Sequence, residues 1–474
     1  MSNISVKKAA LISAISKYST TILNLVFTAV LARLLTPEDY GVVVVSFVFI
    51  SFFQIIADLG LGSAVIQHKE LTKQDVNNIF SFTVRLSILL AVAFSLFSIP
   101  LSLFYKNTVY IPIGLILAVA LIFSTLNIIP NALLMKEKQF LVVGIRTFVI
   151  AMLGSVLAII LAFCGFKYYA LVLQSVFVAI LTFLWNYWST RPKFSIKYNK
   201  ISVEKVRNFS SFQFGFNIIN YFARNSDNLL IGKFMGEATL GYYDKAYKLM
   251  LYPVQNLTHV ITPVLHPILS DYQNDKEYIY KKYMDIVKVL SLLGILVSSI
   301  CFLAADEIIL IVFGELWKEA ITPFRILSLS VWAQMVTSST GAIFQSLGNT
   351  KLMFQAGTVS AVLTVSCIAL GLIKGNLFYL SIFVAIGFNC SFIINFAFLI
   401  LKGFQIKFRE FIKRFIPDMF IASIMIVVIA LYPLNISNII FSIIAKVMVV
   451  VFVYVTFLIL TQQYKIFLVL IKKR

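Results

Sequence analysis

Long apolar runs, separated by short polar segments, make up almost the whole chain. A membrane-spanning helix needs about 20 mostly apolar residues. The runs do not alternate at every second position, so helices rather than barrel strands are expected to cross the bilayer. We therefore predict an all-α integral membrane protein with about 14 transmembrane helices. The predicted spans lie near residues 9–35, 39–67, 78–104, 110–135, 140–163, 168–190, 209–232, 240–268, 284–304, 319–346, 352–373, 376–401, 411–432 and 438–462.

The composition agrees with this pattern and excludes a water-soluble protein. Of the 474 residues, 60% are hydrophobic and 13% are charged, whereas soluble domains carry about 25% charged residues. The net charge of +20 does not indicate nucleic-acid binding, because the basic residues lie between apolar runs. With the N-terminus inside, 25 lysines and arginines fall in inside segments and 6 in outside segments. The positive-inside rule therefore predicts that both termini are cytoplasmic.

Two segments of the chain repeat after an interval of 200 residues. A basic residue, two large apolar residues, a polar turn and a glycine occupy residues 33–41 and recur at residues 233–241. A second echo, at an interval of 213 residues, relates residues 138–144 to residues 351–357. Such a repeat predicts two six-helix lobes of the same orientation, related by an axis along the membrane normal. The expected organisation is an N-terminal lobe (1–190), a basic cytoplasmic linker (191–208), a C-terminal lobe (209–402), and two further helices with a basic tail (403–474).

Polar residues recur at helical spacing within several of the predicted spans. Such residues are costly in hydrocarbon and mark functional sites more often than chance, although a single Ser, Thr or Asn also joins neighbouring helices. Spacings of three, four or seven residues place each set on one helix face. The sets are Lys17 and Asn24 in the first span, Gln213, Asn217, Asn220, Arg224 and Asp227 in the seventh, and Lys245, Lys248, Gln255 and His259 in the eighth. Together they predict a central polar cavity between the lobes.

The chemistry of these sets indicates a ligand with anionic and polyhydroxylated parts. We expect the cations Lys17, Arg224, Lys245 and Lys248 to attract a diphosphate or an acidic sugar. The amides of Asn24, Gln213, Asn217, Asn220 and Gln255 suit a glycan. Asp58, Asp227 and His259 are candidates for gating or for coupling to H⁺ or Na⁺. No Walker A pattern or hydrolase motif occurs, so we predict a transporter without a cofactor rather than an enzyme.

Some residues in the spans are expected to have only structural roles. Arg146 and Lys446 lie near span ends, where their side chains are expected to reach the interface. The four cysteines lie in apolar stretches without a CxxC pattern or a neighbouring ligand pair. We therefore predict neither a disulfide nor a metal site.

Four stretches of the sequence carry a resemblance to a known family. They are residues 31–45 (LARLLTPEDYGVVVV), 58–62 (DLGLG), 225–233 (NSDNLLIGK) and 240–247 (LGYYDKAY). They resemble the bacterial polysaccharide-transporter family, which includes the Wzx-type flippases and belongs to the multidrug/oligosaccharidyl-lipid/polysaccharide exporter superfamily. The matching positions carried over from the family pattern are Arg33, Asp58, Asn225, Asp227, Asn228 and Lys233. Among them, Arg33 and Lys233 are further gating candidates.

The resemblance implies a function and a location. It implies an alternating-access flippase of the bacterial inner membrane that moves polyprenyl-diphosphate-linked oligosaccharide units, for O-antigen, capsule or exopolysaccharide, to the outer leaflet. The implied partners are that lipid-linked oligosaccharide, membrane lipids and other polysaccharide assembly proteins, without nucleic acid. Three alternatives stay open: a peptidoglycan-precursor flippase, a drug/cation antiporter of the same superfamily, and a membrane polysaccharide polymerase.

Overall fold

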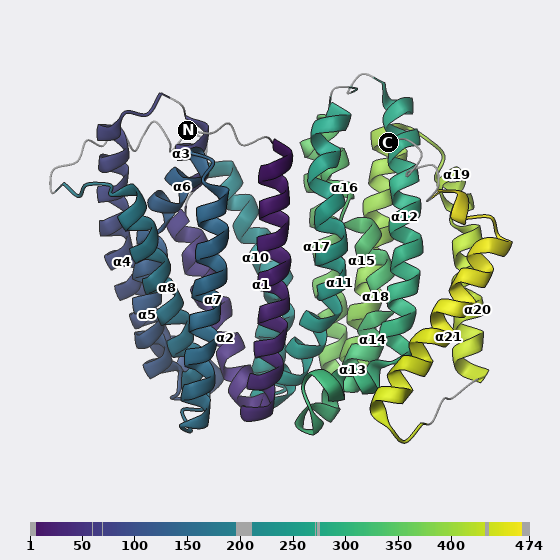
Figure 1. The fold of residues 1–474 in the computed structure, drawn as a ribbon, viewed down its shortest axis with the longest axis horizontal. Helices are drawn as coiled ribbons and strands as arrows, with labels where there is room; N and C mark the ends of the chain where they lie inside the picture. Colours follow the sequence, from purple (N-terminus) through teal and green to yellow (C-terminus); the bar gives the residue numbers. More distant parts are fainter. Residues whose placement is uncertain are drawn as a thin grey trace. The chain divides into compact units, whose positions relative to one another are not determined.

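A computed structural model describes residues 6–58, 60–68, 70–195, 211–270, 272, 275–431 and 436–466. For residues 6–16, 211–220, 223, 259–270 and 428–431, only the backbone is described. All regular elements in the described part are helical, and no strand occurs in it. The chain divides into two compact units, Met1–Gly241 and Tyr242–Arg474, which Figure 1 shows with their helices labelled.

The helices of the first unit pack both on their sequence neighbours and on helices distant in the sequence. Helix α4 packs along α5, and α7 packs against both α1 and α8, while α10 lies against α2. The helices are α1 (Val6–Leu34), α2 (Pro37–Asp58), α3 (Leu61–Gln67), α4 (Lys73–Tyr105), α5 (Tyr110–Leu126), α6 (Ile128–Lys136), α7 (Phe140–Phe163), α8 (Tyr169–Thr190), α10 (Ser211–Phe234) and the start of α11 (Glu237–Ser270).

The second unit continues from α11 and contains more short helices. Its elements are α12 (Lys276–Leu303), α13 (Ala305–Val312), η1 (Glu315–Ala320), α14 (Ile321–Ser328), α15 (Val331–Thr337), α16 (Thr340–Ser346), α17 (Thr350–Ile373), α18 (Leu377–Ala397), η2 (Phe398–Phe404), α19 (Phe408–Lys413), α20 (Ile416–Leu431) and α21 (Ile439–Leu460). Each of the predicted spans falls on one helix or on a succession of short helices. Within the described residues, nine helical segments are long and apolar enough to cross a membrane. The protein is therefore an all-α, multi-pass membrane protein.

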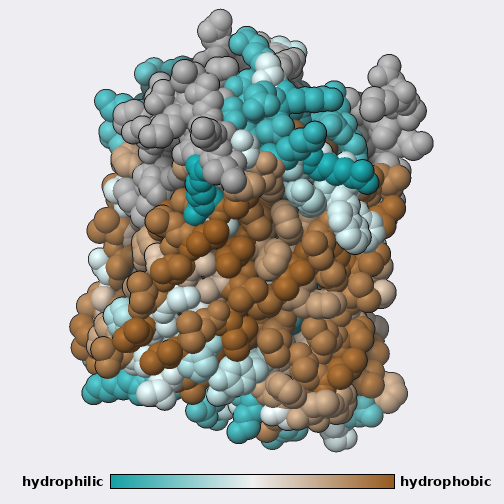
Figure 2. All heavy atoms as spheres, turned by 90° about the vertical axis from the view of Figure 1, so that its left-hand side faces the viewer, coloured by the Kyte–Doolittle hydropathy of each residue, from teal (hydrophilic) through white to brown (hydrophobic). Residues whose placement is uncertain are grey.

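Helix α4 shows how the first unit turns its apolar side chains outward. Leu89, Leu96 and Leu103 follow one face of the helix and are each more than 60% exposed. The opposite face carries buried serines, of which Ser98 donates its hydroxyl to the Ser95 carbonyl. A serine bonded within its own helix leaves no unsatisfied hydroxyl group inside the unit. Figure 2 shows the resulting hydrophobic band between two hydrophilic ends on this side of the molecule.

Two spans predicted to be continuous are broken in the structure. The second span is interrupted between α2 and α3, where Gly60 has a φ of 74°. This left-handed conformation ends a helix and suits glycine, which has no Cβ. The fourth span is interrupted at Asn127 between α5 and α6. Pro130 follows there and has no N–H to give to the carbonyl of Leu126, so the helical bonding pattern fails at this point.

A third predicted span, 319–346, is divided into α14, α15 and α16 after the short η1. Serines near both breaks hydrogen-bond to backbone carbonyls three residues earlier. Ser330 donates to Leu327 and Ser339 donates to Val336, over 2.7 and 2.8 Å. Such local bonds compete with the regular helical pattern, which accounts for the division into short helices.

Buried ion pairs attach α20 and α21 to the rest of the second unit. Asp418 of α20 pairs with Lys288 of α12 and accepts a 2.6 Å hydrogen bond from Ser291. Lys446 of α21 pairs with Glu307 of α13 over 2.6 Å. The expectation that Lys446 reaches the membrane interface is wrong, because its side chain is 12% exposed and neutralised inside the unit.

The two repeated segments meet each other directly within the first unit. A Cβ placed on Gly41 would lie 1.8 Å from the Glu237 carbonyl oxygen, and one on Gly241 would lie 2.0 Å from that of Pro37. Each glycine thus packs on the backbone of the other repeat, and Pro37 and Glu237 are separated by 200 residues, as Gly41 and Gly241 are. We call this the turn–turn contact, formed by residues 37–41 and 237–241. Its reciprocity supports the internal repeat predicted from the sequence.

Candidate functional site

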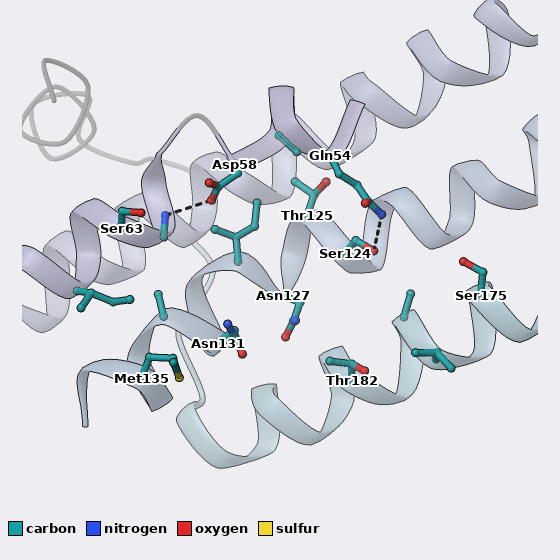
Figure 3. Close-up of a pocket in the computed structure, with 17 residues that line it drawn as sticks. Gln54, Asp58, Ser63, Ser124, Thr125, Asn127, Asn131, Met135, Ser175 and Thr182 are labelled. Carbon is teal, nitrogen blue, oxygen red and sulfur yellow. Dashed lines mark hydrogen bonds between the residues drawn. The ribbon is translucent and has the colours of Figure 1, made fainter. Parts of the chain in front are cut away.

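A cavity of about 620 Å³ lies inside the first unit. Segments of α2, α3, α5, α6 and α8 surround it, so the two helix breaks at Gly60 and Asn127 both lie beside it. Its polar lining consists of hydroxyls, amides and one carboxylate. These residues are Gln54, Asp58, Ser63, Ser124, Thr125, Asn127, Asn131, Ser175 and Thr182, most of which are labelled in Figure 3.

The end of α2 supplies the carboxylate of the cavity. Asp58 is partly buried, and its Oδ1 accepts a long, 3.4 Å hydrogen bond from the Gly62 N–H across the helix break. One turn earlier, Gln54 donates to the Ser124 hydroxyl of α5 over 3.4 Å. Figure 3 shows Asp58 across the cavity from Asn127 and Asn131. Asp58, which was predicted as a gating or coupling candidate, thus lies in a polar cavity.

A buried arginine lies behind the cavity wall that is opposite Asp58. Arg146 of α7 is 7% exposed and donates to Asn131 over 3.3 Å and to Asn186 over 2.6 Å. Asn186 of α8 in turn donates to Asn127 over 2.7 Å. The expectation that Arg146 reaches the interface is wrong, because amide oxygens inside the unit accept its hydrogen bonds. This network was not predicted from the sequence. The spacing of Asn127 and Asn131, which are one helical turn apart, is the sequence signal that could have indicated it.

The predicted stripes on α1 and α10 lie partly outside the described side chains. This applies to Gln213, Asn217 and Asn220 on α10, and to His259 on α11. On α1, Lys17 and Asn24 are exposed. On α10, Arg224 is exposed whereas Asp227 is 4% exposed, and Asp227 accepts a hydrogen bond from the Asn228 N–H. The two charges of this stripe therefore lie in different surroundings.

The other three polar residues predicted on α11, Lys245, Lys248 and Gln255, also lie in different surroundings. Lys245 is 5% exposed and lies 5.7 and 5.9 Å from the ring centres of Phe313 and Trp317. Lys248 pairs with Asp244 over 2.9 Å at a more exposed position. Gln255 is exposed. The shared central cavity that these residues were expected to line remains a prediction.

A second polar cluster surrounds the turn–turn contact. The Glu237 carboxylate accepts hydrogen bonds from Asn107 and Tyr110, both over 3.3 Å. Lys233 lies 4.4 Å from the ring centre of Phe104 and donates to its carbonyl. Arg33, its counterpart in the repeat, is exposed and donates to the Ala29 carbonyl over 3.1 Å. Glu237 was not singled out in the sequence, since a glutamate in a short polar turn carries no distinctive signal.

Comparison with known proteins identifies relatives along most of the chain. The family pattern described as "Polysaccharide biosynthesis protein" matches residues 30–322. The succinoglycan biosynthesis transport protein ExoT of Rhizobium meliloti (strain 1021) is 23% identical over 462 residues, which is 95% of this chain and 92% of that protein. The lipopolysaccharide biosynthesis protein WzxC of Escherichia coli (strain K12) is 25% identical over 76% of this chain and 73% of that protein.

A solved structure shares the fold. The lipid II flippase MurJ, in an inward closed conformation, superposes with a TM-score of 0.75 at 14% sequence identity. The match covers 96% of this chain and 99% of that one. At this level of identity the likeness establishes the arrangement of helices alone.

Proposed function

The chain belongs to the polysaccharide biosynthesis protein family, and from this we propose that it is a flippase for lipid-linked oligosaccharides. Its substrate is a polyprenyl-diphosphate-linked oligosaccharide unit, of the O-antigen, capsule or exopolysaccharide type. The protein moves the unit from the cytoplasmic to the outer leaflet of the bacterial inner membrane by alternating access. It acts as a transporter, and no covalent bond of the substrate is broken.

The observation that carries this proposal is a polar cavity inside a helical unit with an apolar outer face. Side chains such as Gln54 and Asn131 line the cavity, while the leucines of α4 face outward. A glycan is rich in hydroxyls and costly to place in hydrocarbon, so its passage requires polar partners within the membrane. The polyprenyl tail has no such cost and stays in the lipid. Relatives named for succinoglycan transport and lipopolysaccharide biosynthesis support the same substrate class.

Basic residues on α1, α10 and α11 are assigned to the anionic part of the substrate. Lys17, Arg224 and Lys248 are exposed on these helices, and a guanidinium or ammonium group suits diphosphate oxygens. We assign Lys245 to the same group, and the amides Asn24, Gln213, Asn217, Asn220 and Gln255 to the glycan. Both assignments rest on the sequence pattern.

Coupling and gating are assigned to the remaining charged residues. Asp227 and His259 are proposed to carry H⁺ or Na⁺ coupling, with Asp58 as a further candidate. Arg33 and Lys233 lie in the last turns of α1 and α10, four residues before the two segments of the turn–turn contact. With both termini in the cytoplasm, these segments lie on the outer side of the membrane, where they would close the exit path. Release of the substrate then requires them to separate.

Deletion of the gene from its host tests the proposal. The leaflet position of the lipid-linked oligosaccharide is then measured in spheroplasts by its accessibility to a membrane-impermeant reagent added outside. Complete units trapped in the cytoplasmic leaflet, with surface polysaccharide lost, are expected. Units that reach the outer leaflet without being polymerised would indicate a polymerase, and altered drug sensitivity with normal polysaccharide would indicate an antiporter.

A further inference from the structure

The hydrogen bonds of Arg146 determine which way the cavity asparagines are turned. A guanidinium group has only donors, so the atoms that face it on Asn131 and Asn186 must be the amide oxygens. With its oxygen directed at Arg146, Asn186 has its NH₂ group left to donate to the Asn127 oxygen. The orientation of an amide is otherwise ambiguous in a structure. Here the chain of bonds that begins at the arginine resolves it.

The orientation leaves two NH₂ groups without a protein acceptor. Asn127 and Asn131 both line the cavity, and both have their oxygens engaged on the side of α7 and α8. No hydrogen bond from either NH₂ group to another described residue is present. The Nε of Arg146 is likewise buried without a partner. Asn127 and Asn131 are partly buried, so their NH₂ groups are available to donate to a ligand or to water in the cavity, whereas the Nε of Arg146 lies outside the cavity lining.

Across the cavity the available partners are acceptors and hydroxyls. Asp58 provides a carboxylate, and Ser63, Ser175 and Thr182 provide hydroxyl groups. Of the described residues that line the cavity, Asp58 is the one with an ionisable side chain. The volume of about 620 Å³ lies within the range of small-molecule sites. A ligand here must therefore accept hydrogen bonds on one side and donate them on the other.

We propose that this cavity is a subsite for an uncharged sugar residue, which accepts hydrogen bonds from the amides of Asn127 and Asn131 and donates to the carboxylate of Asp58. Each sugar hydroxyl both donates and accepts, and an acetamido group combines a carbonyl acceptor with an N–H donor. The proposal rests on the proposed function, since the sugar would belong to the translocated oligosaccharide. Arg146 acts as a positioning residue, because it turns the amides without lining the cavity itself.

The same geometry argues against two other ligands. A Na⁺ ion needs oxygen ligands, and the asparagine oxygens are already occupied by Asn186 and Arg146. Their NH₂ groups carry partial positive charge and would repel a cation. An acidic sugar would place its carboxylate against Asp58, with no basic side chain among the described lining residues. A neutral sugar meets neither obstacle.

The isosteric substitution Asn131→Asp distinguishes a sugar from a cation. The new carboxylate keeps the oxygen that accepts from Arg146, so the buried arginine gains an ion-pair partner. The atom that faces the cavity changes from a donor to an acceptor. We expect sugar affinity to fall roughly tenfold or more, because a hydrogen bond is lost and an oxygen faces another oxygen. A cation site would instead gain a second carboxylate and bind Na⁺ more tightly.

The measurement is the thermal unfolding midpoint of the purified full chain in detergent. Free glucose, galactose and N-acetylglucosamine are added in separate titrations, and NaCl is compared with choline chloride at equal ionic strength. At least one sugar should stabilise the wild type, and the stabilisation should be reduced in Asn131→Asp. Asn127→Asp is the second variant, since its oxygen still accepts from Asn186. The matched control is Asn438→Asp at the exposed start of α21, where a carboxylate caps the helix equally well.

Three results would overturn the subsite. The subsite is rejected if none of the three sugars stabilises the wild type, or if the asparagine variants respond to sugar as the control does. It is also rejected if Na⁺ stabilises the wild type and stabilises Asn131→Asp more. The translocation assay on lipid-linked oligosaccharide is run on the same wild-type preparation. If the wild type translocates the substrate and any of these three results is found, the subsite is rejected and the flippase function is retained. If the wild type shows no translocation, the proposed function itself is rejected.

Discussion

Substitution of Gly41 by alanine should weaken the turn–turn contact and favour a conformation in which the two turns separate. The added Cβ would lie 1.8 Å from the Glu237 carbonyl oxygen, whereas ordinary contact begins at 3.4 Å. The obstacle is backbone, so it cannot turn aside as a flexible side chain would. Overpacking of this kind costs about 1–3 kcal/mol. If the cost falls on the closed state alone, the equilibrium shifts toward the separated state roughly 5- to 150-fold.

The shift is measured by continuous-wave dipolar broadening between spin labels at Glu38 and Ala238. Both positions are exposed, and one lies in each segment of the turn–turn contact. Cys164 and Cys390, the native cysteines that are not buried, are first replaced by serine. We expect the distances between the two labels to be longer in the alanine variant than in the wild type. Gly241→Ala, whose Cβ would lie 2.0 Å from the Pro37 carbonyl oxygen, should have the same effect because the contact is reciprocal.

Gly357→Ala is the matched control for these variants. A Cβ at this helical position meets no atom within 4 Å, so the substitution should leave the distances unchanged and stabilise α17 slightly. If Gly41→Ala gives the same distance distribution as Gly357→Ala, the turn–turn contact does not hold the turns together, and the gating role assigned to it is refuted.

Three further predictions concern packing and transport. Lys446→Ala should destabilise the second unit by about 3–5 kcal/mol, because it leaves the Glu307 carboxylate buried and unpaired; thermal unfolding should show partial recovery when Glu307→Gln is added. Gly114→Val should lower the unfolding midpoint, since a Cβ there already lies 2.4 Å from that of Ser98, and Gly357→Val is its control. Arg224→Ala should reduce polysaccharide export while the variant still inserts in the membrane at normal abundance; normal export would remove Arg224 from the mechanism.

The helices could be predicted from the sequence because their signal is periodic. Each predicted span falls on one helix or on a succession of short helices. The two segments of the 200-residue echo pack on each other through Gly41 and Gly241, which the sequence did not predict. The breaks within spans were missed. A single Gly60 or Pro130 is tolerated in many membrane helices, so neither residue alone indicates that a span divides.

The candidate site was predicted less completely than the fold. Asp58 was singled out because a carboxylate in an apolar run is conspicuous, and the structure places it in the cavity. The opposite wall depends on Asn127 at the break before α6, Asn131 of α6 and Asn186 of α8, which are joined by the Asn186–Asn127 hydrogen bond and by Arg146. A contact between residues on different helices leaves no trace in the spacing along one helix. The same reason explains why Arg146 and Lys446 were expected at the interface and are buried instead.

Translocation in reconstituted vesicles tests the central claim most directly. The purified full chain is placed in liposomes with a polyprenyl-diphosphate-linked oligosaccharide in both leaflets, and a membrane-impermeant glycosidase is added outside. A flippase exchanges the two leaflets, so nearly all of the oligosaccharide should be cleaved, whereas protein-free vesicles should protect the inner-leaflet share. Protection equal to that of protein-free vesicles, with the chain folded and correctly inserted, would contradict the account.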